Sequence, residues 1–316
     1  MEESMEYRKL GQNGPKIPVI GFGGWPIGGG MGSVSEDTAM NTVREALDRG
    51  YTLIDTAQYY KSSEERIGKV IQEYDRDKLF ITSKVSEDMS AEGVRRAFEN
   101  SLIKLKVDYL DLYQIHWRDK NVPVEETLDA IEKFQSQGKI RYIGVSNFTV
   151  EQLEGAMNHA PIVSNQINYN LFLRTPEERL FPFCKKHGIG LMVHSTLAKG
   201  LLTGKYTLNY RFDSEDERSR FDQYQGETLN RYLAASNELK EFAAEKGWTL
   251  IQTAIAWVLR RDEVSTTLVG MKDPSEVEAP YSAADLRLNK EEIERIEDIL
   301  KKHALENLSP FDWQIV

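Results

Sequence analysis

Four side chains that can bind or release protons follow three consecutive apolar stretches of the sequence. They are Asp55, Tyr60, Lys84 and His116. A tyrosine is a poor acid near neutral pH, because the reference pKa of its phenol is about 10. A nearby ammonium stabilises the phenolate and lowers that pKa, and a carboxylate holds the ammonium in place. With a histidine that hydrogen-bonds a substrate oxygen, these groups could donate a proton to a carbonyl oxygen while its carbon is reduced.

Each of the four residues also has an ordinary structural explanation when it is taken alone. Asp55 could only cap a helix, and Lys84 could lie along the surface with its ammonium in water. His116 could be a core histidine whose hydrogen bonds are satisfied, and Tyr60 could simply pack. Their joint position at the ends of three consecutive apolar stretches favours one shared site over four coincidences.

The elements that would position these residues are short apolar runs that alternate with longer amphipathic segments. Eight runs are typical of buried strands: PVIGF (18–22), YTLID (51–55), LFITSK (79–84), YLDLYQIH (109–116), IRYIGVS (140–146), PIVSNQ (161–166), IGLMVHS (189–195) and STTLVG (265–270). A helix candidate follows each of the first seven runs. Segments 35–50 and 123–138 carry the start and stop signals of helices, and segment 91–105 has apolar residues at helical spacing.

Alternation of strands with helices predicts parallel strands joined by crossover helices. Eight such units favour an α/β fold, a (β/α)8 TIM barrel, formed by residues 1–316 as a single domain with a C-terminal helix. An NG turn in segment 7–19 predicts an N-terminal β-hairpin that could close the bottom of the barrel. Segment 207–228 is a polar insertion after the seventh strand, and it could be either a solvated loop or a functional lid.

Composition excludes several classes of protein. The net charge of −10 and the pI near 5.2 argue against a nucleic-acid partner, because phosphate backbones require a basic face. The single cysteine, Cys184, permits no internal disulfide and favours a reducing compartment. The opening MEESMEYRKL is not a signal peptide, and no apolar run approaches the roughly 20 residues that span a bilayer. We therefore expect a cytoplasmic protein without a membrane partner.

Two other motifs do not lead to a function, and no metal-binding motif occurs. GFGGWPIGGG does not fit a dinucleotide-binding fingerprint, because Pro26 interrupts the most obvious frame. GLLTGKY resembles part of a P-loop, but it is one residue short and has Tyr206 in place of serine or threonine. No spacing of histidine and carboxylate residues indicates a dedicated metal site.

Several motifs resemble those of one family, the aldo-keto reductases. The resemblance extends from about Tyr7 to Lys302 and rests on these motifs: IPVIGFGGW, LIDTAQYY with SEERIG, ITSKV, LDLYQIH, GKIRYIGVSNF, SNQINYN and AKGLLTGKY. It implies a barrel that binds a nicotinamide cofactor, NADP(H) by family habit with NAD(H) as the alternative. It also implies that Tyr60 is the general acid/base, that Asp55 and Lys84 tune it, and that His116 orients the carbonyl.

The resemblance further assigns residues along an extended cofactor. Ser146, Asn147 and Gln166 match residues that bind the nicotinamide carboxamide. Ser195, Leu197 and Lys205 match positions along the pyrophosphate, and Gly270 and Lys272 match the adenosine end. The complete set implied for the cofactor is Gly24, Trp25, Ser146, Asn147, Gln166, His194, Ser195, Leu197, Lys205, Gly270 and Lys272.

The sequence departs from the family pattern at several of these places. His194, a smaller and titratable ring, replaces the aromatic residue that usually stacks on the nicotinamide. Thr196 stands where proline is frequent, and Lys61 where glycine is common. At the adenosine end, Glu276 occupies a position that often carries arginine or glutamine, and Ala279-Pro280 replaces a Glu-Asn pair. An acidic residue there would repel a 2′-phosphate, whereas Lys272 would attract it.

Two classes of function follow from these observations. The first is an NADP(H)-dependent oxidoreductase that interconverts aldehydes or ketones and alcohols. The second is a cofactor-binding regulatory subunit on the same scaffold, like the channel partners of the family, and a barrel that binds phosphorylated sugars is a weaker third. Trp25, Tyr59 and Trp117 would form an aromatic pocket for small or flat carbonyl compounds or sugar-like alcohols. The sequence leaves the physiological substrate and the oligomeric state open.

Overall fold

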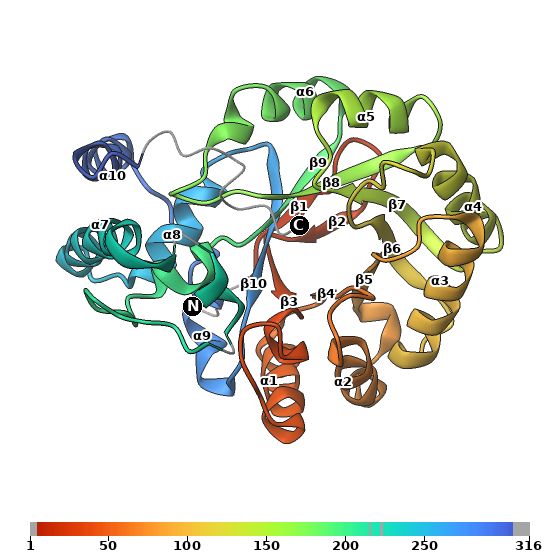
Figure 1. The fold of residues 1–316 in the computed structure, drawn as a ribbon, viewed down its shortest axis with the longest axis horizontal. Helices are drawn as coiled ribbons and strands as arrows, with labels where there is room; N and C mark the ends of the chain where they lie inside the picture. Colours follow the sequence, from red (N-terminus) through yellow and green to blue (C-terminus); the bar gives the residue numbers. More distant parts are fainter. Residues whose placement is uncertain (1–4, 215, 222–223, 306–316) are drawn as a thin grey trace.

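A computed structural model describes residues 5–214, 216–221 and 224–305 (Figure 1). Eight parallel strands close into a barrel in the order β10-β3-β4-β5-β6-β7-β8-β9. The strands are β3 (Ile20–Gly23), β4 (Leu53–Asp55), β5 (Phe80–Val85), β6 (Leu110–Ile115), β7 (Ile140–Ser146), β8 (Ile162–Asn168), β9 (Gly190–His194) and β10 (Val264–Gly270). The predicted (β/α)8 barrel is therefore confirmed.

An N-terminal hairpin precedes the barrel, as the NG turn predicts. Strands β1 (Tyr7–Lys9) and β2 (Lys16–Pro18) pair antiparallel. Leu10 and Ile17 are fully buried, and they pack with side chains from inside the barrel, including Leu53 and Met192. The hairpin thus fills the end of the barrel where the strands begin, which leaves the other end for a site.

Helices surround the barrel (Figure 1). They are α1 (Glu36–Arg49), α2 (Ser63–Val70), α3 (Ala91–Leu105), α4 (Val124–Ser136), α5 (Val150–Met157), α6 (Leu180–His187), α7 (Gly226–Glu245), α8 (Leu250–Leu259), α9 (Glu278–Tyr281) and α10 (Lys290–Lys302). The start of α1 matches its sequence signal, because the hydroxyl of Ser35 accepts a hydrogen bond from the Thr38 amide at 3.1 Å. Its end does too, because Gly50 adopts a φ of 110°.

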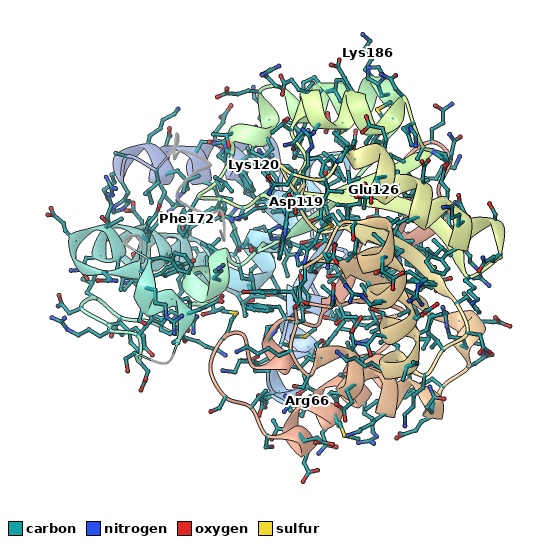
Figure 2. The ribbon with its side chains drawn as sticks, turned by 45° about the vertical axis from the view of Figure 1, so that its right-hand side comes forward. Arg66, Asp119, Lys120, Glu126, Phe172 and Lys186 are labelled. Carbon is teal, nitrogen blue, oxygen red and sulfur yellow. The ribbon has the colours of Figure 1, made fainter. Side chains whose placement is uncertain are left out.

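Side chains on the outer surface and in the core follow the expected division. Lys186 of α6 projects away from the barrel, whereas Phe172 lies inside and packs against Tyr232 of α7 (Figure 2). No helix within the described ranges combines the length and the apolar character needed to cross a bilayer.

The connection between β9 and α7 differs from the other connections. A short 3-10 segment (Ala198–Thr203) follows β9, and a second one (Glu217–Arg220) lies within the polar insertion before α7 begins. The residues between β9 and α7 therefore interrupt the pattern of one helix per strand, and they begin at the carboxyl end of the barrel.

Candidate active site

The four proton-binding residues predicted from the sequence meet at the carboxyl ends of β4, β5 and β6. The Lys84 ammonium donates to Asp55 Oδ2 at 2.7 Å and to the Tyr60 hydroxyl at 3.3 Å. A third donor interaction of Lys84 reaches the Thr56 carbonyl at 2.9 Å. His116 lies beside them, with its ring 5.5 Å from that of Tyr60 in an edge-on arrangement. One chain of contacts thus connects carboxylate, ammonium and phenol.

Burial dominates the electrostatics of this group. Asp55 is 2% exposed and Lys84 is fully buried. Burial raises the pKa of Asp55, and the ammonium of Lys84 acts against that shift. For Lys84, burial alone would lower the pKa, but the opposite charge of Asp55 and the contact with Tyr60 outweigh it, and the pKa is raised. Lys84 therefore remains an ammonium beside the phenol.

Tyr60 departs from the simple expectation. Burial raises the pKa of its phenol above the ordinary value, and the charge of Lys84 lowers it only in part. The contribution of Lys84 has the direction that the sequence predicts, but the net shift is upward. Since desolvation penalises the phenolate, this arrangement keeps the Tyr60 phenol protonated.

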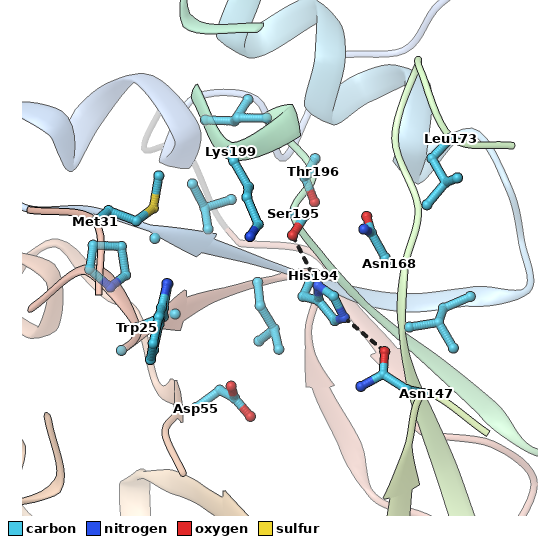
Figure 3. Close-up of a pocket in the computed structure, with 18 of the residues that line it drawn as sticks. Trp25, Met31, Asp55, Asn147, Asn168, Leu173, His194, Ser195, Thr196 and Lys199 are labelled. Atoms are coloured by element: carbon cyan, nitrogen blue, oxygen red, sulfur yellow. Dashed lines mark hydrogen bonds between the residues drawn. The ribbon is translucent and has the colours of Figure 1, made fainter. Parts of the chain in front are cut away.

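A cavity of about 1290 Å³ lies at this end of the barrel, and Asp55 is one of the residues that line it (Figure 3). Asp55, Tyr60 and His116 line it, as does most of the set that the resemblance assigns to a cofactor. The lining members of that set are Gly24, Trp25, Asn147, His194, Ser195, Leu197, Lys205, Gly270 and Lys272. Glu276 also lines the cavity, so its carboxylate faces the same space as Lys205 and Lys272.

Ser146 and Gln166 lie beneath the cavity wall instead of in it. Each is 1% exposed. The amide of Gln166 donates to Asp55 Oδ1 at 2.9 Å, and the hydroxyl of Ser146 donates to the Gln166 carbonyl at 3.0 Å. In this structure both residues therefore support the floor of the site, and Gln166 ties β8 to the Asp55 carboxylate.

Asn147 and His194 are connected at the ends of β7 and β9. Asn147 has a φ of 61°, a left-handed conformation that asparagine tolerates better than most residues. Its amide donates to the His116 carbonyl at 3.1 Å, and its Oδ1 lies 3.3 Å from His194 Nε2. The Ser195 hydroxyl lies 3.0 Å from His194 Nδ1 (Figure 3). Both nitrogens of His194 are thus held by neighbours.

The titration of His194 lies outside the neutral range. Burial, together with the charges of Lys84 and Lys199, lowers its pKa to about 3. The ring is therefore an uncharged flat surface at neutral pH, and its own titration gives the site no pH dependence there.

Three lysines line another side of the cavity. Lys199 has a side chain only 10% exposed, and its ammonium points into the cavity near Ser195 (Figure 3). Lys205 and Lys272 also line this side of the cavity. Glu276 forms an ion pair with Lys205 and accepts a hydrogen bond from the Lys272 amide at 2.8 Å. This carboxylate is therefore held by the ammonium of Lys205 and the backbone amide of Lys272, whose own ammonium donates to the Met31 carbonyl at 2.6 Å.

Residues 216–221 of the polar insertion pack against this side of the cavity, and we call them the strap. Glu217 Oε1 accepts from Trp25 Nε1 and from Lys199 Nζ, each at 3.3 Å. Arg218 is 6% exposed, and its guanidinium donates to the Lys199 carbonyl at 2.7 Å and to the Tyr206 hydroxyl at 2.9 Å. Of the two alternatives for segment 207–228, a plain solvated loop does not describe this part of the chain.

Aromatic rings form the wall next to Tyr60. Trp25 and Tyr59 stack with centroids 5.8 Å apart, and Trp117 meets Tyr59 edge-on at 5.5 Å. Trp117 also stacks on His116 at 4.0 Å. The structure thus brings together the three aromatic residues predicted for a substrate pocket.

Sequence reasoning missed three residues of this site. Ser86 contacts His116, and it lies two residues after Lys84, so the two-residue period of a strand could have placed both on one face. Lys199 lies within AKGLLTGKY, a motif that the sequence analysis quotes without singling out this lysine. Glu217 had no local signal, because only folding brings the strap to Trp25.

One exposed group of potential metal ligands occurs within the described ranges. The ligand atoms of Asp129, Glu132 and His159 lie within 4.8 Å of one another. His159 Nε2 and Asp129 Oδ1 already pair at 2.7 Å. Sequence spacing did not indicate this group, which joins α4 to the chain after α5, and exposed acidic clusters are common without a metal.

The fold and the site together define a TIM barrel with four proton-binding side chains gathered at its mouth. Residues 19–301 match the sequence profile of the aldo/keto reductase family. The chain belongs to the aldo-keto reductase family, as the motifs indicate.

Individual relatives are similar over nearly their whole length. The aldo-keto reductase YhdN of Bacillus subtilis (strain 168) is 38% identical over 320 residues, which cover 97% of each chain. The NADH-specific methylglyoxal reductase of Escherichia coli (strain K12) is 27% identical, covering 89% of this chain and 94% of that protein. The solved structure of the glycerol dehydrogenase AKR11B4 from Gluconobacter oxydans superposes with a TM-score of 0.86 at 32% identity, covering 98% of this chain and 99% of the other.

Proposed function

We propose that this protein is an NADP(H)-dependent oxidoreductase that reduces aldehydes or ketones to alcohols, or runs the reverse reaction, with Tyr60 as the general acid/base. The observation that carries the proposal is the buried contact chain from Asp55 through Lys84 to the Tyr60 hydroxyl, at the floor of a cavity large enough for a dinucleotide and a small substrate. The related proteins described above are named as reductases and dehydrogenases, and none is named as a regulatory subunit.

The donor set of the cavity suits a nicotinamide dinucleotide. The amide of Asn147 and the flat neutral ring of His194 would meet the nicotinamide, which when bound supplies or accepts the hydride. Lys199, Lys205 and Lys272, on another side of the cavity, offer positive charge to the phosphate groups of the dinucleotide.

The residues of the chain would then divide the proton chemistry among them. His116 hydrogen-bonds the substrate oxygen and fixes its position beside Tyr60. The Tyr60 phenol donates its proton to that oxygen as charge develops on it, and Lys84 stabilises the resulting phenolate. Asp55 compensates the buried ammonium throughout. In the alcohol-oxidising direction Tyr60 accepts the proton instead.

The adenosine end bears on the choice between the two nucleotides. Lys205 and Lys272 favour the 2′-phosphate of NADP(H), whereas Glu276 opposes it. Family habit favours NADP(H), and the methylglyoxal reductase relative is described as NADH-specific. Titration of the protein with both nucleotides, followed by fluorescence, decides this preference directly.

The test of the proposed reaction compares the protein with Tyr60→Phe. The wild type should oxidise NADPH or NADH in the presence of a simple aldehyde. Tyr60→Phe should bind the same nucleotide with similar affinity and lose a factor of about 100 or more in kcat, since a positioned acid contributes on that order. Normal turnover by Tyr60→Phe would refute the assignment, and no turnover by the wild type with any carbonyl or alcohol would refute the reaction class.

A further inference from the structure

Among the described residues, one ring nitrogen of His116 has a hydrogen-bond partner and the other has none. Its Nδ1 lies 2.7 Å from the hydroxyl of Ser86. Its Nε2 has no hydrogen-bond partner within the described ranges, and the residue lines the cavity beside Tyr60. Which nitrogen carries the proton decides whether His116 can donate a hydrogen bond to a substrate oxygen, because a neutral imidazole has one donor and one acceptor.

We propose that Ser86 is a positioning residue that holds His116 in the tautomer with its proton on Nε2. This inference rests on the proposed function, since it gives His116 the donor that a carbonyl oxygen requires. The protonated nitrogen of a histidine is generally set by the hydrogen bond that the other nitrogen makes.

The surroundings of Ser86 determine where its own hydrogen goes. Ser86 is 2% exposed, so water does not compete for its hydroxyl. Its two possible acceptors are His116 Nδ1 at 2.7 Å and the Lys84 carbonyl at 3.5 Å. The Lys84 carbonyl already accepts a hydrogen bond from the backbone amide of Gln58 at 3.1 Å. The hydroxyl therefore donates to Nδ1, which must then be unprotonated.

The opposite tautomer is disfavoured by the same contacts. If Nδ1 carried the proton and donated to Ser86, the buried hydroxyl would keep only the 3.5 Å contact for its own hydrogen. A buried donor without a good acceptor is costly. The Nε2 lone pair would then face the substrate oxygen, which is also an acceptor, and the two would repel.

Neighbouring groups fix Ser86 and the ring in place. The Ser86 amide donates to Gln58 Oε1 at 3.0 Å, which sets the backbone at the end of β5. The indole of Trp117 stacks on the imidazole with an angle of 27° between the planes. A second proton on the ring is also disfavoured, because burial and the charge of Lys84 lower the pKa of His116 well below its ordinary value.

The direct test reads the tautomer without reference to turnover. The protein is labelled with ¹⁵N-histidine, and long-range proton–nitrogen NMR spectra distinguish Nδ1 from Nε2 in each of its five histidines. Loss of one signal in His116→Asn assigns His116. The expected result is a proton on Nε2 in the wild type and a mixture of tautomers in Ser86→Ala. A proton on Nδ1 in the wild type would overturn the inference.

Kinetics supply a second, independent readout. Ser86→Ala should lower kcat by about tenfold, the effect of one hydrogen bond of ordinary strength, while the dissociation constant of the nucleotide stays unchanged. Ser86→Thr keeps the hydroxyl and should recover most of the activity. Ser101→Ala removes a buried serine on α3 and serves as the matched control. A kcat for Ser86→Ala equal to that of the wild type would count against the inference.

Failure of the proposed function has a different signature. If the wild type reduces no carbonyl compound with either nucleotide, the proposed reaction is wrong, and the NMR spectra still decide whether Ser86 sets the tautomer. If the wild type is an active reductase and His116 carries its proton on Nδ1, only the role of Ser86 is wrong.

Discussion

The ammonium of Lys84 lies 2.7 Å from the carboxylate of Asp55, and neither group has appreciable contact with water. Desolvation of two charges costs free energy that their attraction offsets only while both are present. This pair therefore links the folding of the barrel to the chemistry at its mouth, because the same ammonium also reaches Tyr60.

Replacing Lys84 with methionine should destabilise the fold as well as abolish reduction. The change leaves the Asp55 carboxylate buried without its cation, and breaking such a pair lowers the free energy of unfolding by about 3–5 kcal/mol. Urea denaturation followed by circular dichroism measures the loss. Lys69→Met is the control, because Lys69 is partly exposed and pairs with the exposed Glu36 at 2.8 Å. If the free energy of unfolding fell by the same small amount in both variants, the burial of the Asp55–Lys84 pair would have no energetic role.

Glu276→Gln should change the preference between nucleotides. The neutral amide removes the charge that would repel a 2′-phosphate and releases Lys205 from its ion pair. We expect NADPH affinity to rise by about fivefold, as removal of roughly 1 kcal/mol of Coulomb repulsion would give, and NADH affinity to stay nearly constant. Lys272→Ala should weaken the binding of NADPH more than the binding of NADH. Fluorescence titrations at low salt measure both.

A neighbouring carboxylate provides the control for this experiment. Glu278 pairs with Arg49 at 2.6 Å and has a side chain that is 63% exposed. Glu278→Gln should therefore leave both affinities unchanged. Equal effects of Glu276→Gln and Lys272→Ala on NADPH and NADH would place the phosphate elsewhere.

Arg218→Ala should release the strap from the barrel. The change leaves the Lys199 carbonyl and the Tyr206 hydroxyl without their buried donor, which costs about 1–3 kcal/mol. Local opening should then become roughly tenfold more frequent. Limited proteolysis with chymotrypsin measures the frequency of this opening, because the segment before the strap contains the cleavable residues Tyr206, Tyr210 and Phe212. Arg220→Ala, on an exposed residue of the same segment, should be cleaved like the wild type; cleavage of Arg218→Ala at the wild-type rate would contradict the anchoring role.

Acid should destabilise the protein partly through His194. Its pKa is about 3 in the folded chain against 6.5 ordinarily, so the unfolded chain binds the proton first as the pH falls. The contribution of this ring to stability is therefore complete above the ordinary pKa and is lost progressively between about pH 6.5 and 3. His194→Gln should lose less stability than the wild type between pH 6.5 and 4, as measured by urea denaturation at each pH.

His159 should behave in the opposite way and serves as the control. The carboxylate of Asp129 raises its pKa, so any stability it contributes is present below the ordinary histidine pKa and is lost as the pH rises through the raised one. His159→Gln should therefore not protect against acid. Identical acid dependence in His194→Gln and the wild type would show that the ring titrates normally.

The fold was largely predictable from local signals. Segment 91–105 was predicted as a helix from its apolar spacing, and α3 has those bounds. The four proton-binding residues were predictable as a set because parallel strands in a barrel end at the same mouth. Sequence could not tell that Gln166 and Ser146 lie below the cavity wall, because depth along a strand depends on how the neighbouring strands are staggered.

Residue types and their periodicity alone determined the eight strands, the caps of α1, and which side chains lie at the strand ends. Only the tertiary structure decided the direction in which burial shifts the pKa values of Tyr60 and His194. It also decided that Ser86 contacts His116 and that the strap places Glu217 against Trp25. The physical reason is that periodicity and capping act over a few neighbouring residues. Desolvation and the pairing of distant charges depend on every element that closes around a site.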